Sequence, residues 1–340
     1  MKEGEEAVVD PSLPIIDPHH HLFDRSGARY LLDDLLSDLG SGHDVQRTVF
    51  IECGTMYRAE CPEALRPVGE TEFANGVAAM SASGVYGKPR ACAGIVGFAD
   101  LRLGEEARPV LDALVHAGGG RFRGVRHLST WDADESLYRY VSRRYPRGLL
   151  LDPAFRLGFA QLAPLGLSFD ALLYFHQLDD LASLARAFPE TTIVLNHLGF
   201  PVGVGPYSGR RNEVFDAWKR LLRKVAIEPN VVVKLGGLGM PLFGFDFHTR
   251  KRPAGSGEIA HAWRPYIETC IELFGTSRCM FESNFPMDRP TCSYTVLWNA
   301  FKRIAESFTP MEKADLFNST AARIYRLELA RSEVLSSTFS

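Results

Sequence analysis

Short apolar runs alternate with amphipathic stretches along most of this chain. Eight runs rich in Val, Ile, Leu and Phe cover residues 13–16, 48–52, 91–98, 122–126, 171–175, 192–195, 231–235 and 279–282. Between them, segments such as 178–188 repeat leucine at three- and four-residue steps, which predicts helices. Strands that are apolar without alternation are buried on both faces, as in parallel sheets. The pattern therefore predicts a (β/α)8 TIM-type barrel.

The regular alternation favours a single domain. We expect the barrel to cover residues 13–327, between an N-terminal tail of residues 1–12 and a C-terminal tail of residues 328–340. A doubly wound open sheet is the alternative fold, although no Gly-x-Gly-x-x-Gly motif opens a helix here. The segments 53–90 and 236–265 are long and follow strands, so in a barrel they would lie on the catalytic face.

Four histidines follow predicted strands. His19 and His21 are two residues apart at the end of the first run, so they share one face and His20 points to the other. Two such imidazoles can hold one divalent cation, although a pair of hydrogen-bonded core histidines has the same spacing. His176 follows the fifth run and His197 the sixth. In a barrel these strand ends surround one axis, which favours a shared site.

Composition and charge limit the classes of partner. The 340 residues are 46% hydrophobic and 23% charged, with a formal charge of -3, so no basic footprint indicates nucleic acid. A small-molecule substrate is expected, and a homo-oligomer remains open. No segment of eighteen uncharged apolar residues indicates a membrane span. The acidic first ten residues do not resemble a secretory signal, and six cysteines without a Cys-x-x-Cys pair fit reduced thiols. We therefore expect a cytoplasmic protein.

Five motifs at strand ends together resemble a known family. They are Asp17-Pro-His-His-His21, Arg123-Gly-Val-Arg-His127, His176-Gln-Leu178, Asn196-His-Leu-Gly199 and Phe281-Glu-Ser-Asn-Phe-Pro286. The chain resembles the amidohydrolase-related proteins of the amidohydrolase superfamily, in their lactonase-like branch, over about residues 13–327. The resemblance implies a distorted (β/α)8 barrel with its site at the carboxyl ends of the strands.

The same resemblance implies a role for each histidine. His19, His21 and His176 would be metal ligands, and His197 would polarise the substrate or act as a further ligand. The implied cofactor is a divalent metal, zinc in the first place, with manganese and metal-free operation left open.

One position departs from the family pattern. The eighth strand of most members ends in Ser-Asp, whereas this chain has Ser283-Asn284. An amide cannot accept a proton near neutral pH and is a poor metal ligand, so Asn284 would orient a water without deprotonating it. Glu52 at the end of the second run is the expected general base, with Glu282 and Asp288 as alternatives. The structural alternative for Glu52 is a buried carboxylate paired with an arginine.

Three further residues are expected to bind substrate. Arg126 ends the fourth run, and its guanidinium can hold a carboxylate or a carbonyl, or instead brace the barrel through an ion pair. Lys234 near the end of the seventh run can neutralise an oxyanion or pair with a buried carboxylate. Tyr57, in the long segment after the second run, can close over a ligand or simply pack.

These features predict a metal-assisted hydrolase of a small carbonyl substrate, above all a lactone or related ester. One alternative keeps the fold and changes the reaction to non-oxidative decarboxylation or hydration of a small carboxylic acid. A second alternative is a non-catalytic ligand-binding barrel, which the loss of the family aspartate would explain.

Overall fold

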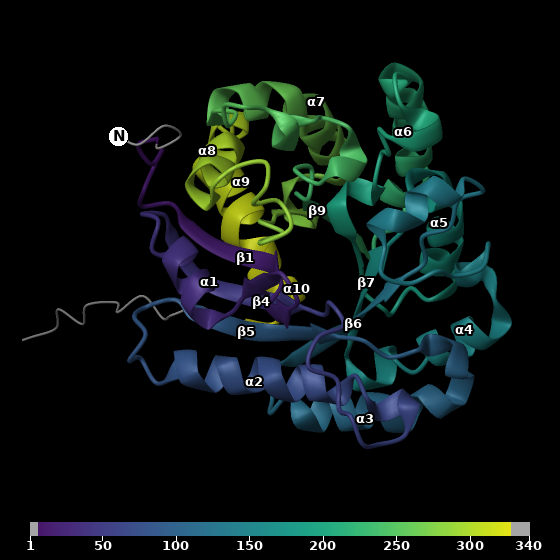
Figure 1. Ribbon diagram of the computed structural model, residues 1–340. Helices are drawn as coiled ribbons and strands as arrows, with labels where there is room; N and C mark the ends of the chain where they lie inside the picture. Colours follow the sequence, from purple (N-terminus) through teal and green to yellow (C-terminus); the bar gives the residue numbers. More distant parts are fainter. Residues whose placement is uncertain (1–5, 328–340) are drawn as a thin grey trace, which may run out of the picture.

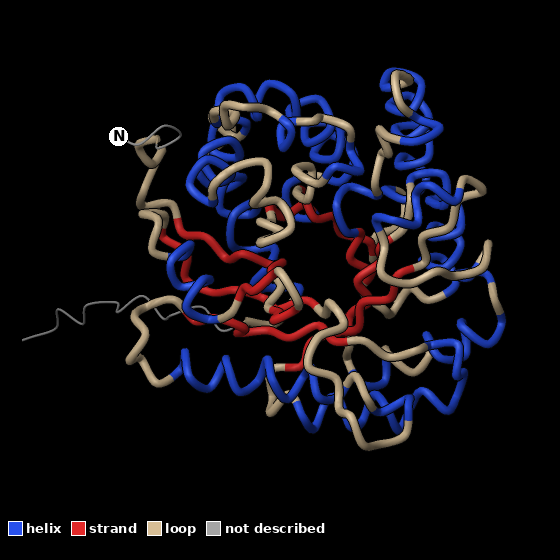
Figure 2. Tube along the Cα trace, in the orientation of Figure 1, coloured by secondary structure: helices blue, strands red, loops and turns tan. Residues whose placement is uncertain are grey.

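A ring of eight parallel strands is surrounded by helices in the computed structural model, which describes residues 6–327 (Figures 1 and 2). Each strand pairs with the next along the chain, as a barrel requires and a doubly wound sheet does not. The strands are β1 (Pro14–His20), β4 (Asp44–Ile51), β5 (Arg90–Gly97), β6 (Phe122–Leu128), β7 (Ser168–Leu172), β8 (Ile193–Leu195), β9 (Val231–Leu235) and β10 (Cys279–Phe281). All eight predicted strands are confirmed.

The helices cover the outside of the ring, and short 3-10 turns fill many connections. The helices are α1 (Leu32–Leu39), α2 (Val68–Ala82), α3 (Ala107–Ala117), α4 (Pro153–Phe159), α5 (Leu178–Ala187), α6 (Arg211–Ala226), α7 (Ser256–Phe274), α8 (Tyr294–Ile304), α9 (Pro310–Ala314) and α10 (Thr320–Ile324). Two of the later helices begin at a capping residue: Ser293 caps α8 by accepting from Val296 N, and Thr309 forms a capping box with Glu312 at α9. A two-stranded hairpin, β2 (Phe23–Arg25) and β3 (Ala28–Tyr30), follows β1.

The barrel interior is divided into an apolar half and a polar half. Inward-facing residues such as Ile16, Val96 and Val232 pack together in the half of the barrel that α10 and Tyr325 cover. Toward the carboxyl ends, the interior holds histidines and charged side chains instead. The apolar half therefore supports the polar half, which forms the site described below.

Residues that follow β10 join the last strand to the first. Ser283 N donates to Asp17 Oδ1 at 2.9 Å, and Asn284 N donates to His19 O at 2.9 Å, beside an isolated bridge between the two segments. Asp17 is fully buried, and this burial raises the pKa of its carboxyl group to about 6. These bonds form the seam that closes the barrel.

The remaining sequence expectations concern the ends and the surface. The described part of the N-terminal tail packs on α8, where Val9 N donates to Asn299 Oδ1 at 2.8 Å, and the predicted C-terminal tail lies outside the described residues.

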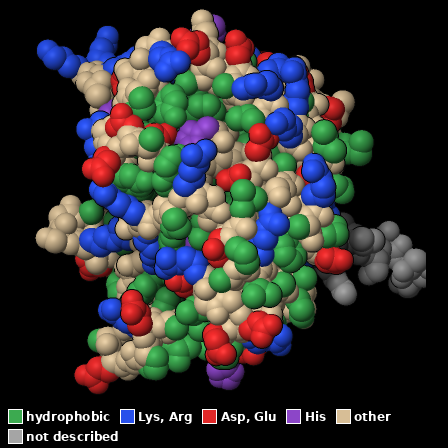
Figure 3. Space-filling model, turned by 90° about the vertical axis from the view of Figure 1, so that its right-hand side faces the viewer, with side chains coloured by type: hydrophobic (Ala, Val, Ile, Leu, Met, Phe, Trp, Pro, Cys, Tyr) green, Lys and Arg blue, Asp and Glu red, His purple; other side chains and the backbone are tan. Residues whose placement is uncertain are grey.

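The six cysteines are free thiols. In residues 6–327, no helix combines the length and apolarity needed for a membrane crossing. On the side that carries α4, α5 and α6, basic and acidic side chains are interspersed (Figure 3).

Candidate active site

A single carboxylate joins two histidines at the carboxyl end of the barrel. Glu282 directly follows β10, His19 belongs to β1, and His197 follows β8. His197 Nδ1 donates to Glu282 Oε1 at 2.6 Å, and Glu282 Oε2 lies 2.7 Å from His19 Nδ1. All three side chains are buried, so these contacts are weakly screened by water. Three different strands thus contribute to one cluster.

His19 and His21 face each other across a short gap. Their Nε2 atoms are 3.3 Å apart, as the shared strand face predicted. His21 Nδ1 donates to the Ile51 carbonyl at 2.9 Å, so the neutral ring keeps a lone pair on Nε2. Burial, as the largest cause, holds the pKa of both imidazoles well below the usual value. Both rings are therefore neutral, the form in which imidazole binds metal.

This donor set fits a divalent cation. Two nitrogen ligands about 2.0–2.1 Å from a tetrahedral zinc ion lie about 3.4 Å apart, close to the observed separation of the two Nε2 atoms. The ligand atoms of His19, His197 and Glu282 also lie within 4.8 Å of one another. The hydrogen bond from His21 to Ile51 fixes the ring orientation, as hydrogen bonds to metal-binding histidines commonly do.

Two cationic side chains flank His19. Lys234 Nζ lies 3.3 Å from His19 Nδ1 and donates to Asp170 Oδ2 at 2.7 Å. Arg126 Nη1 lies 3.4 Å from His19 Nε2, while its Nε donates to Glu52 Oε1 at 2.9 Å. After burial, the charges of Lys234 and Arg126 are further causes of the low pKa of His19. Both carboxylates thus have a cationic partner, and the Glu52 pair matches the structural alternative weighed from the sequence.

A cavity of about 370 Å³ opens above this cluster. His21, His197, Arg126 and Asn284 line its polar floor. Side chains such as Phe200 and others from the segments after the strands form largely apolar walls. The volume is at the small end of the range for ligand pockets, which suits a small-molecule substrate.

Asn284 lies after the last strand, at the position where the family resemblance led us to expect an aspartate. Its backbone is left-handed, with φ 53°, and its Nδ2 donates to Asp288 Oδ1 at 2.8 Å. Asp288 Oδ2 accepts from Gly239 N at 2.9 Å. Burial raises the pKa of Asp288 to about 8 despite these hydrogen bonds. The contact with Asp288 uses the amide nitrogen of Asn284 and leaves the amide oxygen for the cavity.

Two of the expected site residues lie outside this cluster. His176 Nε2 lies 2.9 Å from Asp132 Oδ2, which also accepts from the Tyr207 hydroxyl at 2.8 Å. Tyr57 accepts a hydrogen bond from Arg143 Nη2 at 2.5 Å and lines a neighbouring cavity of about 740 Å³. The structure thus brings together His19, His21 and His197 with Arg126, Lys234 and Asn284, but not His176 or Tyr57.

Two glycines that the site requires were not among the residues predicted from the sequence. A Cβ atom on Gly237 would lie 2.3 Å from His197 Nδ1, and one on Gly236 would lie 2.4 Å from Glu282 Cγ. Gly237 also has φ +75°, in the left-handed region that favours glycine. The available signal was the pair of glycines directly after the seventh apolar run. His197 itself has a left-handed backbone, with φ 50° and ψ 46°, a conformation that is concentrated at functional sites.

Comparison with known families identifies the family of this chain. The family model described as amidohydrolase matches residues 16–327 of the chain. The chain therefore belongs to the amidohydrolase family, and it is a hydrolase of that superfamily, as the strand-end motifs indicated.

Particular relatives extend over most of the chain. A protein of Sinorhizobium fredii named "Uncharacterized protein y4mH" is 32% identical over 337 residues, covering 93% of this chain and 99% of that protein. An L-fucono-1,5-lactonase of Burkholderia multivorans is 27% identical over 285 residues, covering 81% of this chain and 88% of that protein. A solved amidohydrolase of Burkholderia multivorans with bound zinc has a TM-score of 0.70 and 25% identity, covering 92% and 99% of the two chains.

Proposed function

We propose that this protein hydrolyses a lactone to the corresponding hydroxy acid. The observation that carries the proposal is the Glu282 carboxylate, which contacts both His19 and His197 directly below a small cavity. The relatives named as lactonases support this substrate class. In the reaction, water adds to the ring carbonyl, the acyl–oxygen bond breaks, and the ring oxygen leaves with a proton.

His197 moves the proton in this proposal. Because its Nδ1 donates to Glu282, its Nε2 carries the lone pair and can take a proton from water. The same nitrogen then gives the proton to the departing ring oxygen. Glu282 stabilises the imidazolium that forms in between, as a buried carboxylate does for a catalytic histidine. Glu52 is not needed as the base, because its carboxylate is held by Arg126.

Arg126 and Asn284 orient the reactants. The Nη1 group of Arg126 is close to His19 and lines the cavity, so it can donate to the developing oxyanion. The amide oxygen of Asn284 can accept a hydrogen bond from the attacking water. Lys234 lies behind His19, in contact with Asp170, and adds positive potential to the site.

His19 and His21 would hold a divalent cation through their facing Nε2 atoms, with zinc as the first candidate and manganese as the second. When bound, such an ion supplies Lewis acidity that polarises the carbonyl and makes water more acidic. The solved zinc-containing relative supports this assignment.

The test combines metal analysis with a lactone panel. Purified wild-type protein, His19→Ala and the exposed-histidine control His116→Ala are assayed by proton release and by mass spectrometry for the gain of one water. We expect about one equivalent of zinc or manganese and turnover in wild type and His116→Ala, and the loss of both in His19→Ala. Binding of lactones without turnover in any metal condition would refute the proposal and favour a non-catalytic barrel.

A second candidate reaction is decarboxylation of a small carboxylic acid. Arg126 favours it, because a guanidinium beside the histidines can hold a carboxylate by two parallel hydrogen bonds. The same panel, extended to carboxylic acids, distinguishes the reactions, since decarboxylation releases carbon dioxide and the product loses mass.

A further inference from the structure

The candidate cavity is cationic although the chain as a whole is slightly acidic. Three arginines contribute to its lining: Arg25, Arg126 and Arg139. Within the part of the chain that the structure describes, no aspartate or glutamate contributes to that lining. A cavity whose low-dielectric walls carry charge of one sign concentrates ligands of the opposite sign. The lining therefore favours an anionic ligand.

Arg25 and Arg139 reach the cavity from different segments. Arg25 ends β2 in the hairpin after β1, and Arg139 belongs to a 3-10 turn after β6. Each guanidinium lies against an aromatic ring that also lines the cavity, Arg25 at 4.9 Å from the Phe23 centroid and Arg139 at 4.7 Å from the Tyr140 centroid. These cation–π contacts position the two charges before a ligand arrives.

Both guanidinium groups keep hydrogen-bond donors for a ligand. Arg25 Nη2 donates to the Cys53 carbonyl, and Arg139 Nη2 donates to the Tyr140 hydroxyl at 2.7 Å. Each group has five N–H donors, so most remain available. Among residues 6–327, neither arginine has an ion-pair partner, whereas Arg126 is paired with Glu52. Arg25 and Arg139 are thus prepared to bind a carboxylate, which matches guanidinium geometry.

The walls restrict the rest of the ligand. Much of the remaining lining is apolar and includes Leu128, Leu172, Phe200, Met240 and Leu242. A ring with many hydroxyl groups would leave hydrogen bonds unmade against these side chains, at a cost in binding free energy. An apolar ring would bury its surface there without this penalty.

We infer that the substrate is a lactone with few hydroxyl groups that carries a carboxylate, and that Arg25 and Arg139 bind this carboxylate while the ring carbonyl reaches His197. This inference rests on the proposed function and adds the substrate class to it. Arg25 and Arg139 are substrate-binding residues and take no part in proton transfer.

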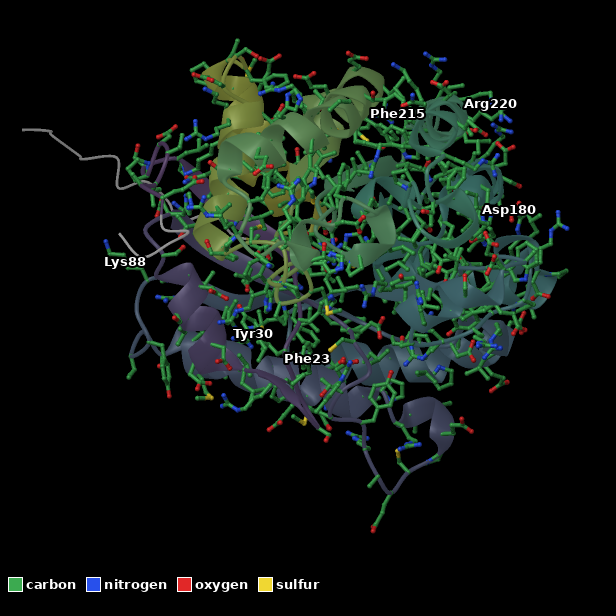
Figure 4. All side chains as sticks on the ribbon, turned by 45° about the horizontal axis from the view of Figure 1, so that its top comes forward. Phe23, Tyr30, Lys88, Asp180, Phe215 and Arg220 are labelled. Atoms are coloured by element: carbon green, nitrogen blue, oxygen red, sulfur yellow. The ribbon has the colours of Figure 1, made fainter. Side chains whose placement is uncertain are left out.

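Direct binding of non-hydrolysable analogues tests the inference separately from turnover. The probes are 3-oxocyclopentane-1-carboxylate and its neutral counterpart cyclopentanone, measured by isothermal titration calorimetry with wild type, Arg25→Met and Arg139→Met. Arg220→Met is the matched control, because it removes one exposed arginine on α6, at the outer edge of the molecule and far from Phe23 at the cavity (Figure 4).

We expect wild type and Arg220→Met to bind the carboxylate at least about 10-fold more tightly than cyclopentanone. Arg25→Met and Arg139→Met should each weaken carboxylate binding by about 10- to 100-fold, as expected for lost charge-assisted hydrogen bonds, and leave cyclopentanone binding unchanged. The inference would be overturned if wild type bound the two probes equally tightly or did not bind the carboxylate. It would also be overturned if Arg25→Met and Arg139→Met weakened the binding of both probes equally.

Turnover then separates the inference from the proposed function. The substrates are 5-oxotetrahydrofuran-3-carboxylate and D-glucono-δ-lactone, a lactone rich in hydroxyl groups. Arginine-dependent binding of the carboxylate probe without hydrolysis of any lactone would uphold the ligand class and refute the proposed function. Faster hydrolysis of the hydroxyl-rich lactone would uphold the proposed function and overturn the substrate class.

Discussion

Replacing Gly237 with alanine should reduce both catalysis and stability, because the new side chain would displace His197. The new Cβ would lie 2.3 Å from His197 Nδ1 and 2.7 Å from its Cγ, so the ring would have to move by about 1 Å to restore ordinary contact. His197 cannot move freely, because Nδ1 donates to Glu282 at 2.6 Å. A misplacement of about 1 Å costs about 100-fold in rate, so we expect kcat/KM to fall by about this factor.

The cost in stability can be worked from the same geometry. Alanine in the left-handed region costs about 1–2 kcal/mol, and overpacking adds about 1–3 kcal/mol. Gly209→Ala is the matched control, because Gly209 has φ +73° with no atom within 4 Å of a new Cβ. Gly209→Ala should therefore lose only the roughly 1–2 kcal/mol of stability that the left-handed backbone costs an alanine, and should keep full activity.

The assay is urea unfolding together with kcat/KM on the lactone that wild type hydrolyses fastest. Gly237→Ala should be less stable than Gly209→Ala by about 1–3 kcal/mol. Activity of Gly237→Ala within about threefold of wild type, with stability equal to that of Gly209→Ala, would refute the view that His197 must hold its position.

Three further predictions follow from individual contacts. Glu282→Gln removes the charge shared by two imidazoles, so kcat should fall by about 100- to 10,000-fold with little change in circular dichroism. Asn284→Asp puts a second carboxylate beside Asp288, whose pKa is already about 8, so the loss in thermal midpoint should be larger at pH 9 than at pH 6, because both groups ionise at pH 9. Burial and the charge of Lys302 lower the pKa of His43 to about 4 in the folded protein. As pH falls from about 6.5 toward 4, His43 is protonated in the unfolded chain but not in the folded one, so the folded state should lose about 2 kcal/mol of stability at pH 5. Urea unfolding of His43→Gln should lack this loss.

The strands and the first histidine pair could be predicted because they depend on local periodicity. Four to eight consecutive apolar residues suffice to mark a buried strand, and the period of two placed His19 and His21 on one face. His176 shows the limit of this reasoning. The fifth predicted run extended to residue 175, but β7 ends at Leu172, and a 3-10 turn over Phe175–Gln177 carries the imidazole to Asp132.

The role of Glu282 could not be derived from periodicity for a similar reason. β10 ends at Phe281, so alternation no longer determines where the next side chain points. Its position depends on contacts with His19 and His197, which are more than eighty residues away in sequence. Such pairings are set by the closed barrel as a whole. Gly236 and Gly237, directly after β9, were visible in the sequence, but the side chains that need the space beside them were not.

The seam between the first and last strands has a consequence for the order in which activity is acquired. Residues 283–285 bind the chain around residues 17–21, and the neighbouring Glu282 completes the histidine cluster. During synthesis, His19 and His21 are made almost at the start of the chain. Glu282 is added only after more than four-fifths of the chain has been made. Enzymatic activity should therefore appear only once the residues after β10 have paired with β1. A refolding experiment that follows activity measures when this closure of the barrel occurs.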